Sequence, residues 1–139
     1  MGSEMCIRDR YLGTFDNSHY FKKPDGDLRY EAARVFVESR GGNLPVINSE
    51  AENNFLRNVA GNGTYWLALT DENQEGSFEW TTGASVDYTN WNQNEPNDFG
   101  TGEDYTAVRL DGSWNDVKAT GFHWAITVSY THLTLPTKA

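Results

Sequence analysis

The 139-residue sequence contains a single cysteine, Cys6, so no disulfide bond is expected within one chain. It also lacks any run of about 18 apolar residues, the length that a membrane-spanning helix needs, so no membrane insertion is expected. The length suits one domain and is too short for two. A single core must therefore be held together without covalent cross-links.

Basic residues are nearly missing from one region. Residues 71–116 hold eleven acidic side chains and one basic side chain, Arg109, for a charge of −10, whereas the rest of the chain carries +1. Proteins that bind nucleic acids use basic patches that neutralise phosphates. Nucleic acid is therefore not an expected partner.

The acidic region is expected to form loops. Pro96, Gly100, Gly102 and Gly112 interrupt residues 91–116, and both residue types break regular backbone hydrogen bonding. The carboxylates gathered there repel one another unless a cation lies among them. Asp, Glu and Asn oxygens favour calcium over zinc or copper. The alternative is a solvated acidic loop in which Asn, Asp and Gly serve as turn formers.

Three short motifs follow one another in this region: Glu95-Pro96-Asn97, Glu103-Asp104 and Trp114-Asn115-Asp116. In their order and spacing they resemble the C-type lectin-like domain, and specifically its mannose-type members. The resemblance implies an α+β fold over residues 11–127, with two helices flanking small antiparallel sheets and a long calcium-binding loop.

The resemblance also implies two kinds of calcium site. The ligands of the principal ion, which also binds the sugar, would be Glu95, Asn97, Glu103, Asn115 and Asp116. Pro96 would be a cis-proline, so that the side chains on either side of it aim at one ion. One or more auxiliary calcium ions would be held by Asp71, Glu75, Asp98, Asp104 and the backbone carbonyl of Glu103.

Five side-chain oxygens and the Asp116 carbonyl would supply six ligands, and calcium accepts six to eight. Two coordination positions would stay open for the two hydroxyls of a vicinal diol. In the family, Glu-Pro-Asn accompanies equatorial hydroxyls as in mannose, N-acetylglucosamine or fucose, and Gln-Pro-Asp accompanies galactose. The implied function is calcium-dependent binding of glycans with equatorial vicinal hydroxyls, outside the cell or on its surface. The alternative is a calcium-stabilised module that binds protein or another surface without sugar.

An enzyme is not expected. Two carboxylates could serve a glycosidase, but its general acid must keep a proton near neutral pH. Carboxylates that share a divalent cation are driven to the ionised form. The sequence also contains no Ser-His-Asp, Cys-His or phosphate-binding glycine motif. His19 is expected to be a strand residue, and His123 an exposed one.

Hydrophobic periodicity predicts the helices and strands. One helix is expected over 28–40, with Leu28, Ala32, Val35 and Phe36 on its apolar stripe, and another over 48–60, capped by Ser49 or Asn48. Strands are expected at 11–15, 18–21, 43–47, 65–70, 78–80, 105–110, 113–116 and 122–126. The core is expected to include Trp66, Trp91 and Trp114.

The lack of cysteine is the main departure from the family. The resemblance places the usual half-cystines at Val37, Tyr105, Ala119 and Thr127, so both bridges are missing together, as in bacterial proteins that resemble this family. Each bridge contributes about 2–5 kcal/mol, so packing and calcium are expected to carry more of the stability. Residues 5–10 and 128–137 resemble translated adapter sequence at the ends of metagenomic gene fragments, so residues 1–10 and 128–139 are expected to be non-native tails.

Overall fold

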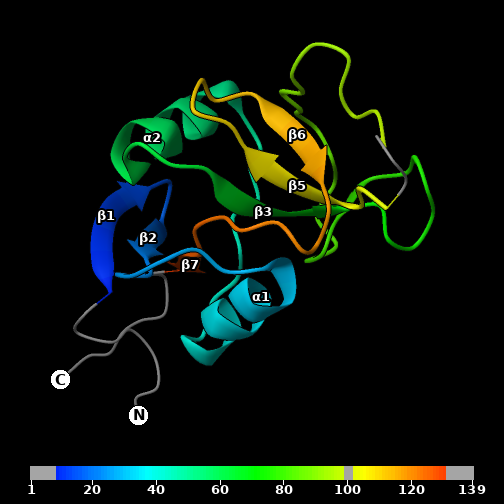
Figure 1. Ribbon diagram of the computed structural model, residues 1–139. Helices are drawn as coiled ribbons and strands as arrows, with labels where there is room; N and C mark the ends of the chain where they lie inside the picture. Colours follow the sequence, from blue (N-terminus) through cyan, green and yellow to red (C-terminus); the bar gives the residue numbers. More distant parts are fainter. Residues whose placement is uncertain (1–8, 99–101, 131–139) are drawn as a thin grey trace, which may run out of the picture.

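The computed structural model describes residues 9–98 and 102–130, which form an α+β fold (Figure 1). The elements in these residues are β1 (Arg10–Phe15), β2 (Ser18–Lys22), α1 (Tyr30–Ser39), α2 (Glu50–Ala60), β3 (Tyr65–Thr70), β4 (Glu79–Trp80), β5 (Tyr105–Val108), β6 (Trp114–Val117) and β7 (Ile126–Tyr130). The strands make two antiparallel sheets, in the orders β1-β2-β7 and β4-β3-β5-β6. The expected fold class is confirmed.

The helices pack on the first sheet, with α1 against β7 and α2 against β1. The segments that join β3 to β5 leave the second sheet on the side away from β1, to the right in Figure 1. Neither helix in the described part of the chain has the length and apolarity that a membrane crossing requires.

Helix α1 buries a different stripe from the expected one. Its buried residues are Tyr30, Ala33 and Val37. Val35 is instead 51% exposed, and Leu28 lies outside the helix, because its backbone N–H and C=O pair with those of His123 at 2.9 and 3.1 Å. Both stripes are apolar, and tertiary contact decides between them, since the ring of Tyr30 packs edge-on against the buried Trp66.

Helix α2 begins at the expected cap. The side-chain oxygen of Ser49 accepts the N–H of Glu52 at 3.1 Å, and the Glu52 carboxylate accepts the N–H of Asn48 at 2.8 Å. These reciprocal bonds satisfy two backbone donors at the start of the helix. The inner face of α2 carries the fully buried Leu56.

Two of the expected strands are wrong. Residues 43–47 form no strand, and their place in a ladder is limited to an isolated bridge between Asn43 and Val128. Pro45 has no N–H to give to a sheet, and its carbonyl accepts the N–H of Ala68 at 2.9 Å. The last strand spans 126–130 rather than 122–126, and it pairs with β2 along its whole length. The folded part of the chain therefore continues past residue 127.

His123 is partly buried rather than exposed, which corrects the expectation. Its ring stands edge-on to Trp66 with centroids 4.6 Å apart, and its Nδ1 lies 2.6 Å from the hydroxyl oxygen of Thr64. Burial lowers the pKa of His123, which favours the neutral ring. His19 lies in β2, as expected, with Nδ1 2.7 Å from the Thr14 hydroxyl.

Non-covalent packing occupies the positions at which the resemblance places half-cystines. Tyr105 stacks on Tyr30 with ring centroids 4.0 Å apart, and this contact joins β5 to α1. Val37 and Thr127 are both buried, where α1 packs on β7. The two helix-to-sheet connections are thus made by side-chain packing.

The fully buried indole of Trp114 is the centre of an aromatic cluster. Trp80, Tyr88 and Trp91 stand edge-on around it with centroid separations of 5.8–5.9 Å. Trp66 and Trp114 are core residues, as expected, whereas Trp91 is partly buried at the edge of the core.

A buried amide fixes this indole to α2. The Trp114 indole N–H donates to Asn53 Oδ1 at 2.9 Å, and Asn53 Nδ2 donates to the Gly112 carbonyl at 2.9 Å. Asn53 is only 2% exposed, so water cannot replace these bonds. A side chain of α2 thereby holds the turn and the first residue of β6.

We expect Asn53→Ala to lower the free energy of unfolding by about 1–3 kcal/mol, because the Trp114 N–H would be left buried without an acceptor. Asn54→Ala, at the exposed next position of the same helix, is the matched control. Both substitutions raise helix propensity by the same amount. The difference between the free energies of unfolding of the two variants therefore reports the lost hydrogen bonds. Urea unfolding at fixed calcium measures it, and equal stabilities of the two variants would contradict the assignment.

Candidate functional site

The pairing of β3 with β5 brings together two acidic residues that are distant in sequence. Thr70 pairs with Tyr105 in antiparallel register, so Asp71, directly after β3, lies opposite Asp104, directly before β5. The N–H of Asp71 donates to the backbone carbonyl of Asp104 at 3.0 Å. Sheet register alone therefore sets these two carboxylates side by side.

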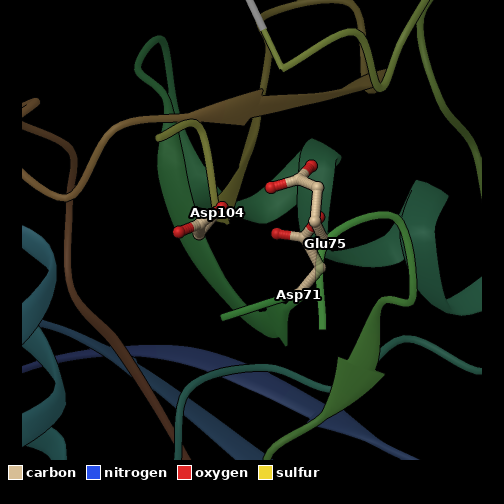
Figure 2. A group of neighbouring side chains, drawn as sticks. All are labelled: Asp71, Glu75 and Asp104. Atoms are coloured by element: carbon tan, nitrogen blue, oxygen red, sulfur yellow. The ribbon is translucent and has the colours of Figure 1, made fainter. Parts of the chain in front are cut away.

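A tight turn adds Glu75 to this pair. The N–H of Gly76 donates to Asp71 Oδ2 at 2.8 Å, which folds residues 71–76 back on themselves. One oxygen from each of Asp71, Glu75 and Asp104 lies within 4.8 Å of the others. Figure 2 shows Asp71 and Glu75 on one segment and Asp104 arriving from another. Asp71 is buried and Glu75 is exposed, so the group opens to solvent on the Glu75 side.

Crowding changes the acidity of this group. Desolvation, followed by the carboxylates of Asp71, Asp98 and Asp104, raises the pKa of Glu75 to about 7. Desolvation and then the carboxylate of Asp71 also raise the pKa of Asp104. Asp98 contributes to both shifts, and its Oδ1 accepts the N–H of Glu103 at 3.0 Å. The four acids expected to hold an auxiliary ion are therefore electrostatic neighbours.

A second cluster forms around the start of β6. The N–H of Trp114 donates to the Asn90 carbonyl, and the N–H of Asn92 donates to the Trp114 carbonyl, both at 2.8 Å. These bonds align residues 90–92 with β6. The long loop is thereby attached to the strand that carries Asn115 and Asp116.

Asp116 holds the Glu95-Pro96-Asn97 segment in place. Its carboxylate accepts the N–H of Asn97 at 3.2 Å and the N–H of Asp98 at 2.7 Å. The peptide bond between Glu95 and Pro96 is cis. Asp116 is only 1% exposed, so these N–H groups are its means of stabilisation within the described residues.

The carboxyl group of Glu95 lies beside that of Asp116. Desolvation, contact with Asp116 and the nearby charge of Glu103 raise the pKa of Glu95 to about 7, and a hydrogen bond from the Asn97 backbone partly offsets this rise.

Four oxygens in these two clusters are buried without a hydrogen-bond donor: Asp71 Oδ1, Asp104 Oδ1, Glu95 Oε1 and Asn115 Oδ1. A buried acceptor left without a donor destabilises the fold by about 1–3 kcal/mol. Hydrogen bonds within the described residues do not satisfy these atoms. A hard cation that takes oxygen ligands would satisfy them, and the donor set of carboxylate and amide oxygens fits that class of ion.

The clusters contain most of the expected ligands. Glu95, Glu103 and Asp116 gather near the start of β6, where Asn115 directly precedes Asp116, and Asn97 enters the cluster through its backbone N–H. Sequence reasoning missed Asn90 and Asn53, whose amides both donate to the Gly112 carbonyl. Any residue type can offer a backbone carbonyl, so a hydrogen bond to one leaves no pattern in the sequence from which these two residues could have been predicted.

In the presence of a chelator, the domain should lose stability as the pH rises from about 4.5 to 8. Glu75 and Glu95 ionise near their ordinary pKa of 4.5 when unfolded but near 7 when folded. The folded state therefore binds more protons in this window, and stability falls as they are removed. Thermal unfolding across this pH range measures the slope.

Two further measurements give this test its controls. Glu95→Gln should flatten the slope, because it removes one of the carboxyl groups whose pKa is raised in the folded state. Added calcium should oppose the slope, because metal binding needs the ionised carboxylates. Stability that increases from pH 4.5 to 8 in chelator would contradict the crowding described above.

The sequence matches known proteins over most of the described residues. Residues 27–125 match the family described as Lectin C-type domain. The chain is 40% identical over 98 residues to the mouse low affinity immunoglobulin epsilon Fc receptor, and 37% identical over 95 residues to chicken hepatic lectin. These alignments cover 70% and 67% of this chain but only 29% and 46% of the relatives, so the chain spans less than half of their length.

Solved structures resemble it over nearly the whole chain. The carbohydrate-recognition domain of the human scavenger receptor C-type lectin superposes with a TM-score of 0.81 at 25% identity, covering 92% of this chain and 100% of that one. The cow CD23 domain, crystallised in the presence of GlcNAc2Man3 oligosaccharide, gives 0.81 at 29% identity, covering 93% and 98%.

A calcium-independent type II antifreeze protein, at a TM-score of 0.79 and 20% identity, covering 91% of this chain and 94% of that one, shares the fold alone. The curated relatives are receptors and lectins rather than enzymes, in agreement with the expectation that this chain is not an enzyme. With the family matched over residues 27–125 and the fold shared throughout, the chain belongs to the C-type lectin domain family.

Proposed function

We propose that this domain binds carbohydrate through a calcium ion held by Glu95, Asn97, Glu103, Asn115 and Asp116. The observation that carries the proposal is a pair of buried oxygens without donors: Glu95 Oε1, whose carboxyl group lies beside that of Asp116, and Oδ1 of Asn115, the residue before Asp116 on β6. Calcium, when bound, supplies a centre with coordination positions that two sugar hydroxyls can fill. The similarity to hepatic lectin and to the CD23 domain supports this function.

The chain's own residues account for sugar selection. A hydroxyl both donates and accepts hydrogen bonds, a carboxylate only accepts, and a primary amide can donate through nitrogen. Glu95 therefore accepts a hydrogen bond from a hydroxyl, and the Asn97 amide donates one to its oxygen. We infer that this arrangement selects glycans with equatorial vicinal hydroxyls, such as those of mannose, N-acetylglucosamine and fucose.

We assign at least one auxiliary calcium ion to Asp71, Glu75, Asp98, Asp104 and the backbone carbonyl of Glu103. Asp98 touches both clusters, because its N–H donates to Asp116 and its carboxylate accepts the N–H of Glu103. Neutralising the auxiliary cluster therefore also steadies the loop that carries the principal one. The receptor and lectin relatives support a place for the domain outside the cell or on its surface.

One observation favours the alternative of a calcium-stabilised module that binds protein or another surface without sugar. In the described residues, the auxiliary group Asp71, Glu75 and Asp104 brings three carboxylate oxygens within 4.8 Å of one another. If calcium bound at that group alone, it would stabilise the loop without offering positions to a sugar.

Calcium at a hundred times its Kd should stabilise the domain by about 2.7 kcal/mol, and mannose-agarose should retain it until a chelator is added. Two variants separate the sites. Asn115→Ala should lose sugar retention and keep part of the calcium-dependent rise in Tm, whereas Asp71→Asn should lower that rise and keep retention at high calcium. Retention by Asn115→Ala equal to the parent would favour the alternative module.

The double substitution Glu95→Gln with Asn97→Asp should shift the preference from mannose-type to galactose-type ligands. It keeps the net charge and nearly the volume, but exchanges an acceptor and a donor on either side of the diol. A mismatched hydrogen-bonding pair costs about 1–3 kcal/mol, or roughly ten- to hundredfold in affinity. Glycan arrays with multivalent display measure the ratio. Normal calcium binding with an unchanged ratio would show that sugar does not sit on this ion.

A further inference from the structure

A cavity of about 400 Å³ lies where the β1–β2 turn, residues 43–49, the first turn of α2 and residues 82–84 meet. Its volume is within the range of small-molecule sites. None of the expected calcium ligands lines it. The cavity is therefore separate from the site of the proposed function.

Backbone bonds fix the walls of this cavity. Asn43 and Val128 exchange both of their backbone hydrogen bonds, at 3.1 and 2.8 Å, and the capping bonds of Ser49 hold the first turn of α2. The N–H of Thr81 donates to the Ala68 carbonyl at 2.8 Å and positions the segment that enters residues 82–84. The cavity is therefore preformed.

The lining combines negative charge with an apolar surface. Two carboxylates, those of Asp16 and Glu52, line the cavity, and its lining contains no lysine, arginine or histidine. Among the described residues, the Glu52 carboxylate accepts from two neutral donors, the Tyr20 hydroxyl at 2.7 Å and the Asn48 N–H at 2.8 Å. The apolar part of the lining comes from Phe15, Leu44, Val46 and Val128.

The start of α2 opposes this charge but does not cancel it. A helix N-terminus carries the equivalent of about half a positive charge, and the two carboxylates exceed it. A neutral ligand would leave both carboxylates without a cationic partner within the described residues. An anionic ligand would be repelled.

We propose that this cavity binds a primary amine on a short aliphatic stem, with the ammonium group at the carboxylates of Asp16 and Glu52 and the stem on the apolar lining. Either a free alkylamine or the lysine side chain of a peptide carries this chemistry. The site does not need calcium, because none of its groups is an expected calcium ligand.

Three probes with the same stem test the charge preference: pentylamine, pentan-1-ol and pentanoate. Amide chemical-shift titrations of the calcium-loaded domain should show binding at residues 15–18, 43–49 and 82–84. Pentylamine should bind at least about fivefold more tightly than pentan-1-ol at low salt, and added salt should weaken only the amine. Equal binding of amine and alcohol, or tighter binding of pentanoate, would overturn the proposal.

Substitutions then assign the preference to the two carboxylates. Asp16→Asn keeps the side-chain shape and tolerates the backbone φ of +49° at this exposed turn residue. It should weaken pentylamine by about two- to fivefold, the range of an exposed charge pair, and leave pentan-1-ol unchanged. Adding Glu52→Gln should bring the amine-to-alcohol ratio close to one. Asp27→Asn, an exposed carboxylate outside the cavity, is the matched control and should change neither ligand.

The same titration with Nα-acetyl-lysine amide distinguishes the two sources. Binding that depends on Asp16 would assign the cavity to lysine side chains, and binding of pentylamine alone would assign it to free amines. An amine affinity that is unchanged in the double variant would contradict the proposal whichever probe was used.

Discussion

The indole N–H of Trp114 must find an acceptor inside the core, and the rest of the site depends on how it does so. The acceptor is Asn53 of α2, and the same amide also holds the Gly112 carbonyl. Because Asn115 and Asp116 directly follow this indole on β6, their positions are fixed relative to a helix on the other side of the core. The backbone bonds between residues 90–92 and Trp114 pass that alignment on to the long loop. An irregular loop can thus present ligands with the precision of a sheet.

The two carboxylate clusters destabilise the fold until their negative charge is neutralised. Two carboxyl groups, Glu75 and Glu95, have their pKa raised to about 7, and four buried oxygens lack donors. Relatives with disulfide bonds can hold such a loop covalently. This chain has a single cysteine and cannot form a disulfide bond within itself. Under the proposed function, the ion that takes part in recognition also removes the repulsion. Both the stability of the domain and its binding of sugar would then depend on the calcium concentration.

Much of the site could be predicted because its residues are close in sequence order or follow from strand register. Glu95, Asp116 and their neighbours stand in motifs whose spacing survives in the sequence, and Asp71 meets Asp104 wherever β3 pairs with β5. The predictions were wrong where two local sequence patterns were equally good and a tertiary contact decided between them. Helix α1 has two apolar stripes, and packing on Trp66 selected the one with Tyr30. The role of Asn53 could not be predicted for a related reason. Its partners, the Trp114 indole and the Gly112 carbonyl, lie about sixty positions away in the sequence.

The stacked rings of Tyr30 and Tyr105 have a consequence for where and how this fold can be assembled. A cystine needs an oxidant to form and is lost to a reductant, whereas two stacked rings form and separate with the folding transition itself. The described core should therefore reach its final structure in a reducing solution, with no isomerase and no mispaired intermediates. Thiol reagents that dismantle cross-linked lectins would leave its backbone connections untouched. Under the proposed function, a sensor or display scaffold built on this chain could then be loaded by adding calcium and emptied by a chelator, in media that reduce disulfide bonds.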